Sequence, residues 1–202
     1  MAAALVGVPL AVFAGPQSDR ELIGQLDREV IALRQKISLL ETRVAECGTP
    51  TQAPTVYPEL VQVFTGGPVT VTRRGSTTLV SMPGDMLFSA GTVAVREEAG
   101  FALDLLATAL NSHPELAVTL VGHTDGDPPT GPLKKLYPTN WELSYARALA
   151  VARVLTEQHK VPASRITVAG RADLDPNLDN DTPEGRAANR RVVAHLIPGA
   201  RQ

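Results

Sequence analysis

The first pattern along the chain is a heptad repeat of apolar positions over residues 18–47. The spacing alternates between three and four, as in a coiled coil whose a and d side chains share one side of a helix. The a positions are β-branched and the d positions before Cys47 are leucine, which favours two parallel strands. We therefore expect a parallel homodimer here, with a single helix packed on its own domain as the alternative. The repeat consists of Ile23, Leu26, Val30, Leu33, Ile37, Leu40, Val44 and Cys47.

Charged residues beside this repeat support a parallel arrangement. In a parallel dimer, Glu29 at a g position faces Arg34 at an e position of the second chain. Lys36 and Glu41 repeat this attraction one heptad later. Cys47 occupies the last d position, where two parallel chains bring equivalent side chains together. We expect either an interchain disulfide through Cys47 or a small apolar side chain in the seam.

The segments on either side of the heptads have different compositions. Residues 1–14 are apolar and end in small residues, which is typical of a secretory signal peptide. A helix of this length reaches about 21 Å, against roughly 30 Å of hydrocarbon, so a truncated anchor or a buried apolar arm are the alternatives. Residues 48–68 open with a proline-rich stretch that lacks charge, and this composition predicts a semi-extended linker.

From residue 69 the pattern changes to short apolar strands that alternate with amphipathic helices. This alternation predicts an α/β (α+β) two-layer sandwich over residues 69–198, although the strand order is not readable from it. A capping box formed by Thr139 and Glu142 marks the start of one helix. Strands are predicted within 69–82, with a turn at Arg74 and Gly75, and at 116–122, 165–170 and 192–197. Helices are predicted at 93–112, at 139–159 and from Thr182.

Composition excludes several classes of function. Nineteen Lys and Arg against 21 Asp and Glu leave a net charge of -2, which argues against a nucleic-acid partner. Aromatic residues make up 4% of the chain, too few for base-stacking platforms or aromatic sugar grooves. The single cysteine excludes an intrachain disulfide framework and a cysteine-rich zinc module.

Complementary charges follow the strand predicted at 116–122. Thr124 and Asp125 lie on the loop after it, and Asn140, Ser144 and Arg147 share one face of the next helix. An aspartate and an arginine from two elements can hold a zwitterion, with its carboxylate on the guanidinium and its ammonium on the aspartate. An ordinary ion pair between Asp125 and Arg147 is the alternative.

Four motifs in this order resemble the OmpA-like peptidoglycan-binding domain over residues 69–198. They are GHTDGDPP from Gly122, NWELSYARALAV from Asn140, GRADLDP from Gly170 and NDTPEGRAANRRV from Asn180. The insertion over 127–139 is most similar to that of flagellar motor stator subunits (MotB). The chain departs from the family pattern where Ser89 replaces a frequent acidic residue and where GRAD replaces a Gly-aromatic-Gly sequence.

The resemblance implies a binding domain that is not an enzyme and needs no cofactor. In that family the ligand is the diaminopimelate of a peptidoglycan stem peptide, held without a covalent bond. The matching positions make Asp125 and Arg147 the principal contacts and Asn140 and Arg190 supporting contacts. Thr124 contributes through its hydroxyl or its backbone.

Together these features predict a periplasmic, cell-wall-associated homodimer that tethers or positions an envelope component. An envelope or membrane protein is then a further partner, and N-terminal membrane anchoring is an option. One alternative is a stator-like subunit anchored in the inner membrane, whose start lies upstream. Another is a cell-wall hydrolase that uses Ser144, His123 and Asp125. The spacing of His123, Asp125 and Asp127 matches no common ligand pattern, so we expect no metal.

Overall fold

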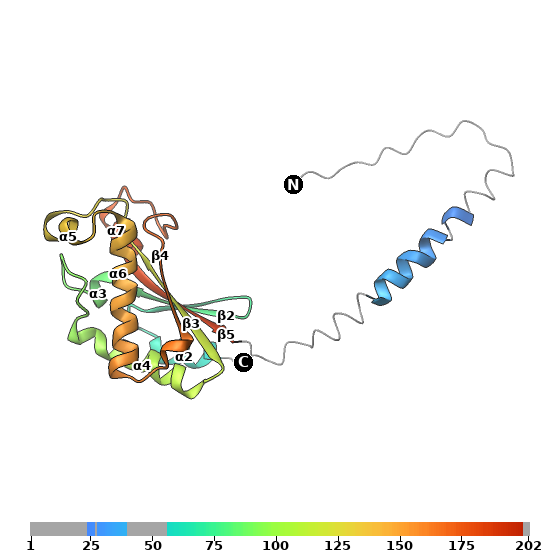
Figure 1. Cartoon of the computed structure of the whole chain (residues 1–202), viewed down its shortest axis with the longest axis horizontal. Coiled ribbons are helices and arrows are strands. Elements are labelled where there is room, and N and C mark those ends of the chain that lie inside the picture. The colour runs from blue at the N-terminus through green and yellow to red at the C-terminus, as the bar shows by residue number, and fades with distance from the viewer. Residues whose placement is uncertain (1–23, 27, 40–55, 200–202) are drawn as a thin grey trace. The chain divides into compact units, whose positions relative to one another are not determined.

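The computed structural model describes residues 24–26, 28–39 and 56–199, which fall into two separate units of the chain. Residues 24–26 and 28–39 are helical, as the heptad pattern predicts for this part (Figure 1). Its repeat positions are about half exposed, with values of 52% for Leu26, 52% for Leu33 and 54% for Ile37. Their pairing in a coiled coil stays a prediction. The apolar segment 1–14 and Cys47 lie outside the described residues.

Within residues 56–199 the structure has one five-stranded sheet, in the order β1-β2-β5-β3-β4. All neighbouring strands are antiparallel except β3 and β4, which are parallel. The last strand of the sequence therefore lies at the centre of the sheet, between β2 and β3. The strands are β1 (Thr70–Arg74), β2 (Thr77–Pro83), β3 (Leu116–His123), β4 (Ile166–Gly170) and β5 (Arg191–Pro198).

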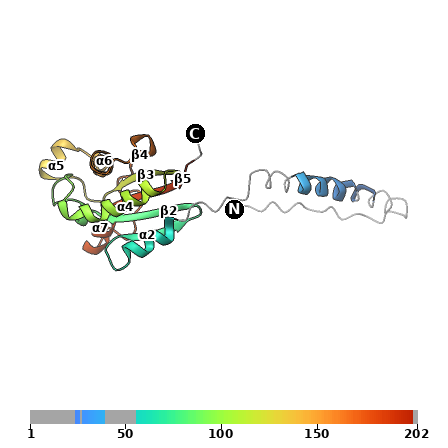
Figure 2. The same ribbon diagram turned by 90° about the horizontal axis from the view of Figure 1, so that it is seen from below.

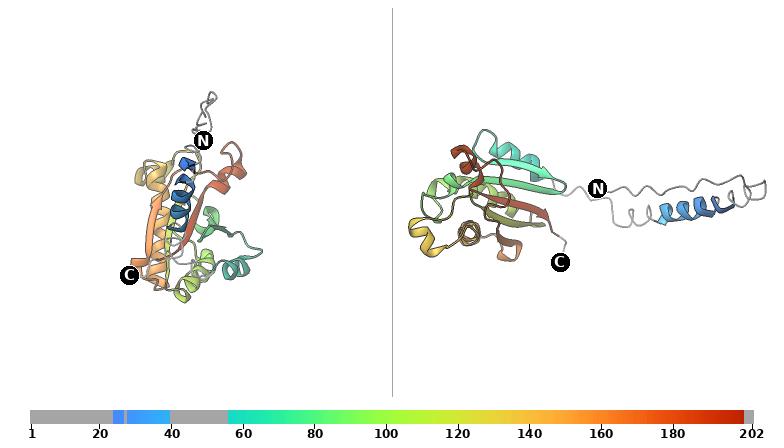
Figure 3. Two further views of the ribbon diagram at one scale, coloured as in Figure 1. Left: turned by 90° about the vertical axis from the view of Figure 1, so that its right-hand side faces the viewer. Right: turned by 90° about the horizontal axis from the view of Figure 1, so that it is seen from above.

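Helices cover one face of this sheet. The apolar core contains residues of α2, α4 and α6 together with alternate residues of β2, β3 and β5, such as Val80, Leu120 and Ala194. In Figure 2, α6 is seen nearly end-on, and Figure 3 shows the β1–β2 hairpin at the opposite edge of the sheet from α6. The fold is thus a mixed α/β domain with a single sheet. Its helices are α2 (Val56–Phe64), α3 (Gly84–Leu87), α4 (Gly100–Ser112), α5 (Gly131–Leu136), α6 (Asn140–Arg153) and α7 (Pro183–Asn189).

Local sequence signals fix several of these elements as predicted. The capping box at the start of α6 is present, with Thr139 as the N-cap and Glu142 completing it. Thr182 caps α7, and Pro183 occupies its first turn. A π-helical turn at Val154–Gln158 continues α6 to the end predicted for that helix.

Two predictions need correction. The linker predicted over 48–68 is wrong from Val56 to Phe64, where α2 buries apolar side chains four residues apart against the core. Pro58 does not prevent this helix, because it lies in the first turn, where its missing N–H is not needed. The helix predicted from residue 93 begins later, with a 3₁₀ turn at Glu97–Ala99, because Val95 is held extended by a bridge to Phe88.

A helix that crosses a lipid bilayer needs about 20 predominantly apolar residues. None of the helices within residues 24–39 and 56–199 combines the length and apolar character that crossing a membrane requires.

Candidate functional site

Sheet topology brings three charged residues to one edge of the sheet. Strands β2 and β3 end there and β5 begins there, since the last residues of both β2 and β3 pair with Arg191. Asp85 follows β2, Asp125 follows β3 and Arg190 precedes β5. Residues that are far apart in the sequence are therefore neighbours at this edge, where α5, α7 and the start of α6 also lie (Figure 1).

Helix α6 reaches the same edge because two glycines allow it to lie directly on the sheet. A Cβ atom at Gly122 of β3 would stand 1.9 Å from the carbonyl oxygen of Ser144. A Cβ atom at Gly170 of β4 would stand 2.6 Å from the Ser144 hydroxyl oxygen. Any larger side chain would push the helix away. This close approach sets the position of Arg147, one turn beyond Ser144.

An ion-pair bridge holds the edge together. Nη1 of Arg190 donates to Oδ2 of Asp125 at 2.8 Å, and Nη2 donates to Oδ2 of Asp85 at 3.0 Å. Burial would lower the pKa of Arg190, but the hydrogen bonds to Asp125 and Asp85 outweigh it and raise the pKa. Arg190 is therefore a firmly charged bridge between two carboxylates that come from different strands.

Arg147 lies beside this bridge without joining it. Among the described residues no carboxylate lies within ion-pair distance of Arg147, so the ion pair between Asp125 and Arg147 that the spacing also allowed is not formed. The Arg147 Nε is buried without a hydrogen-bond partner, and Cζ lies 5.6 Å from the ring centroid of Phe88. Burial lowers the pKa of Arg147, with Asp125 acting against it. A buried guanidinium in this state favours an added anion.

A cavity of about 220 Å³ opens beside these groups. It exposes two guanidinium groups and one carboxylate, that of Asp85, whose side chain is 67% exposed. The sequence alone did not single out Asp85, which supplies an acidic group to the cavity that Ser89 also lines. The sequence does show an aspartate just after a predicted strand. Only the strand order shows that this aspartate lies next to Arg190. The lining residues are Gly84, Asp85, Phe88, Ser89, Ala90, Gly91, Arg147 and Arg190.

Three of the predicted site residues, Asp125, Asn140 and Thr124, lie beside the cavity and do not line it. Nδ2 of Asn140 donates to the backbone oxygens of Asp125 at 3.2 Å and of Asp127 at 3.1 Å, which fixes the loop after β3. The backbone N–H of Thr124 donates to the backbone oxygen of Ala172 at 2.9 Å. Oδ1 of Asn140 and Oγ1 of Thr124 are both buried without a partner. Unsatisfied buried polar atoms are rare, and here they gather around Asp125.

The Ser-His-Asp arrangement weighed for a hydrolase is not assembled. Oγ of Ser144 donates to the backbone oxygen of Trp141 and accepts from the backbone N–H of Ala172. Gly122 faces Ser144, so the next residue, His123, points to the other face of β3. Over residues 24–39 and 56–199, no three His, Cys, Asp or Glu side chains gather in a way that could hold a metal ion.

His123 should make stability depend on pH. Its side chain is 3% exposed, and burial lowers its pKa to about 4, with Arg191 adding to the effect. The unfolded chain binds a proton near pH 6.5 and the folded chain does not, so stability is complete above that pH and is lost as pH falls toward 4. We expect the free energy of unfolding to fall by roughly 2 to 3 kcal/mol over this interval.

Urea unfolding at a series of pH values measures how the free energy of unfolding changes with pH. The variant His123→Gln should show a clearly smaller decrease between pH 6.5 and 4, with the remainder due to other groups such as His195, whose pKa is also lowered by burial. An unchanged slope in the variant would show that His123 does not titrate in this way.

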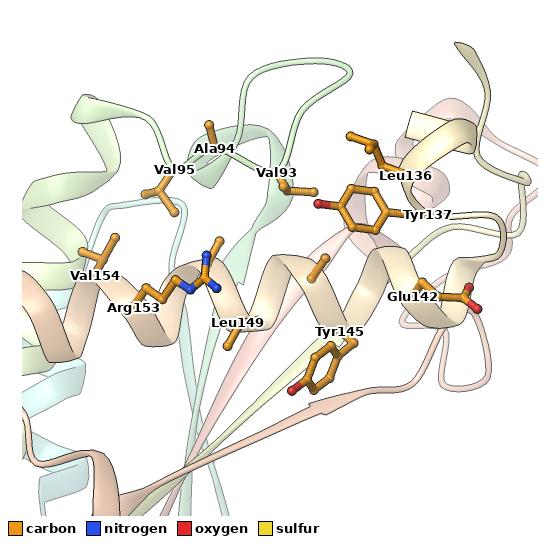
Figure 4. Close-up of a pocket in the computed structure, with 12 residues that line it drawn as sticks. Val93, Ala94, Val95, Leu136, Tyr137, Glu142, Tyr145, Leu149, Arg153 and Val154 are labelled. Carbon is orange, nitrogen blue, oxygen red and sulfur yellow. The ribbon is translucent and has the colours of Figure 1, made fainter. Parts of the chain in front are cut away.

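A larger cavity, of about 740 Å³, lies along the other side of α6 (Figure 4). Apolar side chains from residues 93–95 and from α6 line it together with Tyr137 and Tyr145. Its charged side chains are Glu142, which belongs to the capping box, and Arg153. Because it offers no adjacent pair of unengaged opposite charges, this groove is a poorer match for a zwitterion than the cavity beside Arg147.

Comparison with known proteins finds one family model and several bacterial relatives that this domain resembles. The OmpA family model matches residues 87–190. A curated relative named probable lipoprotein YiaD, from Escherichia coli, is 35% identical over 133 residues, which cover 66% of this chain and 57% of that protein. This chain spans from about a third to a little over half of the length of the first curated relatives it matches.

Two solved structures are similar in both fold and sequence. A MotB-like protein from Desulfovibrio vulgaris superposes with a TM-score of 0.65 and 28% identity, covering 71% of this chain and 92% of that chain. The cell wall anchor of the type VI secretion system from Pseudomonas aeruginosa superposes with a TM-score of 0.60 and 33% identity. That match covers 74% of this chain and 98% of the anchor.

Proposed function

Because the chain belongs to the OmpA family, we propose that its second unit binds peptidoglycan through the diaminopimelate of the stem peptide. The single observation that carries the proposal is the buried guanidinium of Arg147, which lacks an ion-pair partner among the described residues and lies beside two carboxylates. Similarity to a structure described as a cell wall anchor supports the choice of ligand. The proposed role is to tether or position an envelope component at the wall, in the periplasm.

The charges suggest how the free end of diaminopimelate is held. Its carboxylate accepts hydrogen bonds from Arg147, the guanidinium whose charge is not already matched, with Arg190 as a second donor. Its ammonium lies against Asp125, whose carboxylate is held in place by the hydrogen bond from Arg190. Asn140 contributes by fixing the backbone of the loop that carries Asp125. Thr124 contributes its buried hydroxyl, which has no other partner. The ligand is bound and released unchanged.

Co-sedimentation of the full chain with purified sacculi tests the proposal directly. Free diaminopimelate should compete with the sacculi, whereas Nα-acetyl-lysine amide should not, because its blocked α-carboxyl group leaves an ammonium without the carboxylate that Arg147 is proposed to hold. Equal competition by Nα-acetyl-lysine amide would contradict the proposed role of Arg147. Release of soluble muropeptides during the incubation would instead indicate a wall-cleaving enzyme.

We further propose that residues 18–47 pair as a parallel coiled coil, giving two wall-binding domains to each dimer. The exposed apolar stripe of the described helix supports this, since Val30 and Leu33 are 45% and 52% exposed within a single chain. A dimer would bind a repeating polymer more tightly, because its second contact is intramolecular.

Substitution within the heptads should separate dimer from monomer. Leu33→Glu places a charge in the seam and should give a monomer at roughly tens of micromolar protein, because the apolar d position is lost. Ile31→Glu is the matched control, since Ile31 is equally exposed but lies outside the a and d positions. Analytical ultracentrifugation of the full chain measures the oligomeric state of both variants.

Mild oxidation should also give a covalent dimer that Cys47→Ser abolishes. A full chain that is already monomeric would rule out the coiled coil.

A further inference from the structure

A second polar cavity lies on the face of the sheet that the helices leave uncovered. Its volume is about 260 Å³, and side chains from four strands and one loop line it. The strand residues that line it alternate with those of the core: Thr72 and Arg74 of β1, for example, flank Arg73, which points to the opposite face. The lining residues are Thr70, Thr72, Arg74, Leu79, Ser81, His123, Asp175, Asn177, Arg191, Val193 and His195.

Positive charge dominates this cavity. Arg74 and Arg191 line it together with two histidines, and Arg171 is close enough to lower the pKa of both His123 and His195. Asp175 is the single acidic side chain among the lining residues, and it raises the pKa of both histidines. No carboxylate of the described residues lies within ion-pair distance of the lining arginines. The cavity thus combines two arginines that form no ion pair within the described residues with one acid.

Two of these groups are almost completely buried, which is unusual without a partner. Arg191 is 6% exposed, and its guanidinium donates only to the backbone oxygens of Asp175 at 2.8 Å and Asn189 at 3.3 Å. His123 is 3% exposed, and its Nδ1 has no hydrogen-bond partner within the part of the chain that the structure describes. Burial lowers the pKa of Arg191, and Asp175 acts against this without forming an ion pair. A buried cation with no ion pair and a buried nitrogen with no partner among the described residues both carry an energetic cost. An anion in the cavity would relieve both.

We propose that this cavity is a binding site for phosphate or for a phosphate monoester. Guanidinium groups recognise phosphate oxygens through paired N–H donors, and the hydroxyls of Thr70, Thr72 and Ser81 add neutral donors along the wall. A tetrahedral oxyanion has enough acceptor oxygens to meet donors that arrive from several strands at once. The site is separate from the cavity beside Arg147, because adjacent residues such as Gly122 and His123 point to opposite faces of β3.

Titration of the full chain with inorganic phosphate, followed by NMR of the histidine ring nitrogens, tests this proposal. We expect the His123 and His195 signals to shift with a saturable curve. Glycerol 1-phosphate and vesicles of phosphatidic acid, compared with phosphatidylcholine vesicles, distinguish a soluble phosphate monoester from the same monoester on a lipid. Absence of any saturable shift with all of these probes would overturn the proposal.

Three variants show whether the cavity itself binds the anion. Arg74→Gln should weaken phosphate binding roughly two- to fivefold, the effect of an exposed charge contact. Arg73→Gln is the matched control, because it removes the same charge from the next residue of β1 on the opposite face. Asp175→Asn should strengthen binding by a similar factor, since it removes the competing acid. Equal weakening by Arg73→Gln and Arg74→Gln would show a general charge effect and contradict the proposal. Sacculus binding is expected to stay unchanged in all three.

Discussion

Replacing Arg147 with alanine should weaken binding to sacculi and to free diaminopimelate roughly ten- to a hundredfold, while the domain stays folded. Arg147 is the cation at the proposed site whose charge is unmatched within the described residues, so a ligand carboxylate has most to gain there. Its guanidinium also lies over the ring of Phe88, and this contact limits rotation of the guanidinium plane. Arg147→Lys should fail as well, because an ammonium cannot present two parallel donors.

Arg153→Ala is the matched control for this prediction. Arg153 belongs to the same helix and carries the same charge, but it lines the apolar cavity on the other side of α6 (Figure 4). Co-sedimentation and isothermal titration calorimetry measure binding, and circular dichroism checks that each variant is folded. If folded Arg147→Ala binds sacculi as well as the unchanged protein does, Arg147 is not the carboxylate contact. If folded Asp125→Ala also binds fully, the whole site assignment is wrong.

Gly122→Ala should destabilise the domain by about 2 to 4 kcal/mol, which is a large effect for one methyl group. The added Cβ would meet the backbone carbonyl of Ser144 at 1.9 Å, and a backbone group of a helix cannot move aside alone. Helix α6 would have to shift as a unit, and Arg147 would move with it. Urea unfolding measures the loss of stability, and the folded fraction should also bind sacculi more weakly.

Gly100→Ala provides a control with the opposite sign. Gly100 opens α4, and no heavy atom lies within 4 Å of the position that its Cβ would take. Alanine there should leave stability unchanged or raise it by up to about 1 kcal/mol, because glycine is a poor helix former.

Equal unfolding midpoints for Gly122→Ala and the unchanged protein would show that α6 does not lie against β3 as closely as described.

Local signals in the sequence determined much of this protein. Period-two and helical patterns predicted the five strands and the helices α4, α6 and α7, and Thr139 with Glu142 marked the start of α6, because these features depend on neighbours in the chain. The short helices α3 and α5 were not predicted. The order and content of the four motifs were enough to identify the OmpA family, which the family comparison confirms. Their place on a strand-end loop and on the next helix made Asp125 and Arg147 candidates, and the resemblance to the family added Arg190.

Only the tertiary structure decided how those charges are paired. Spacing suggested an ion pair between Asp125 and Arg147, but β5 is inserted between β2 and β3, and so Arg190 binds Asp125 and brings in Asp85. Among the described residues, Arg147 is left without an ion-pair partner. Strand order also created the cationic cavity on the other face of the sheet. Such pairings depend on contacts between residues up to 105 positions apart, and no local pattern encodes which of several oppositely charged groups will be nearest.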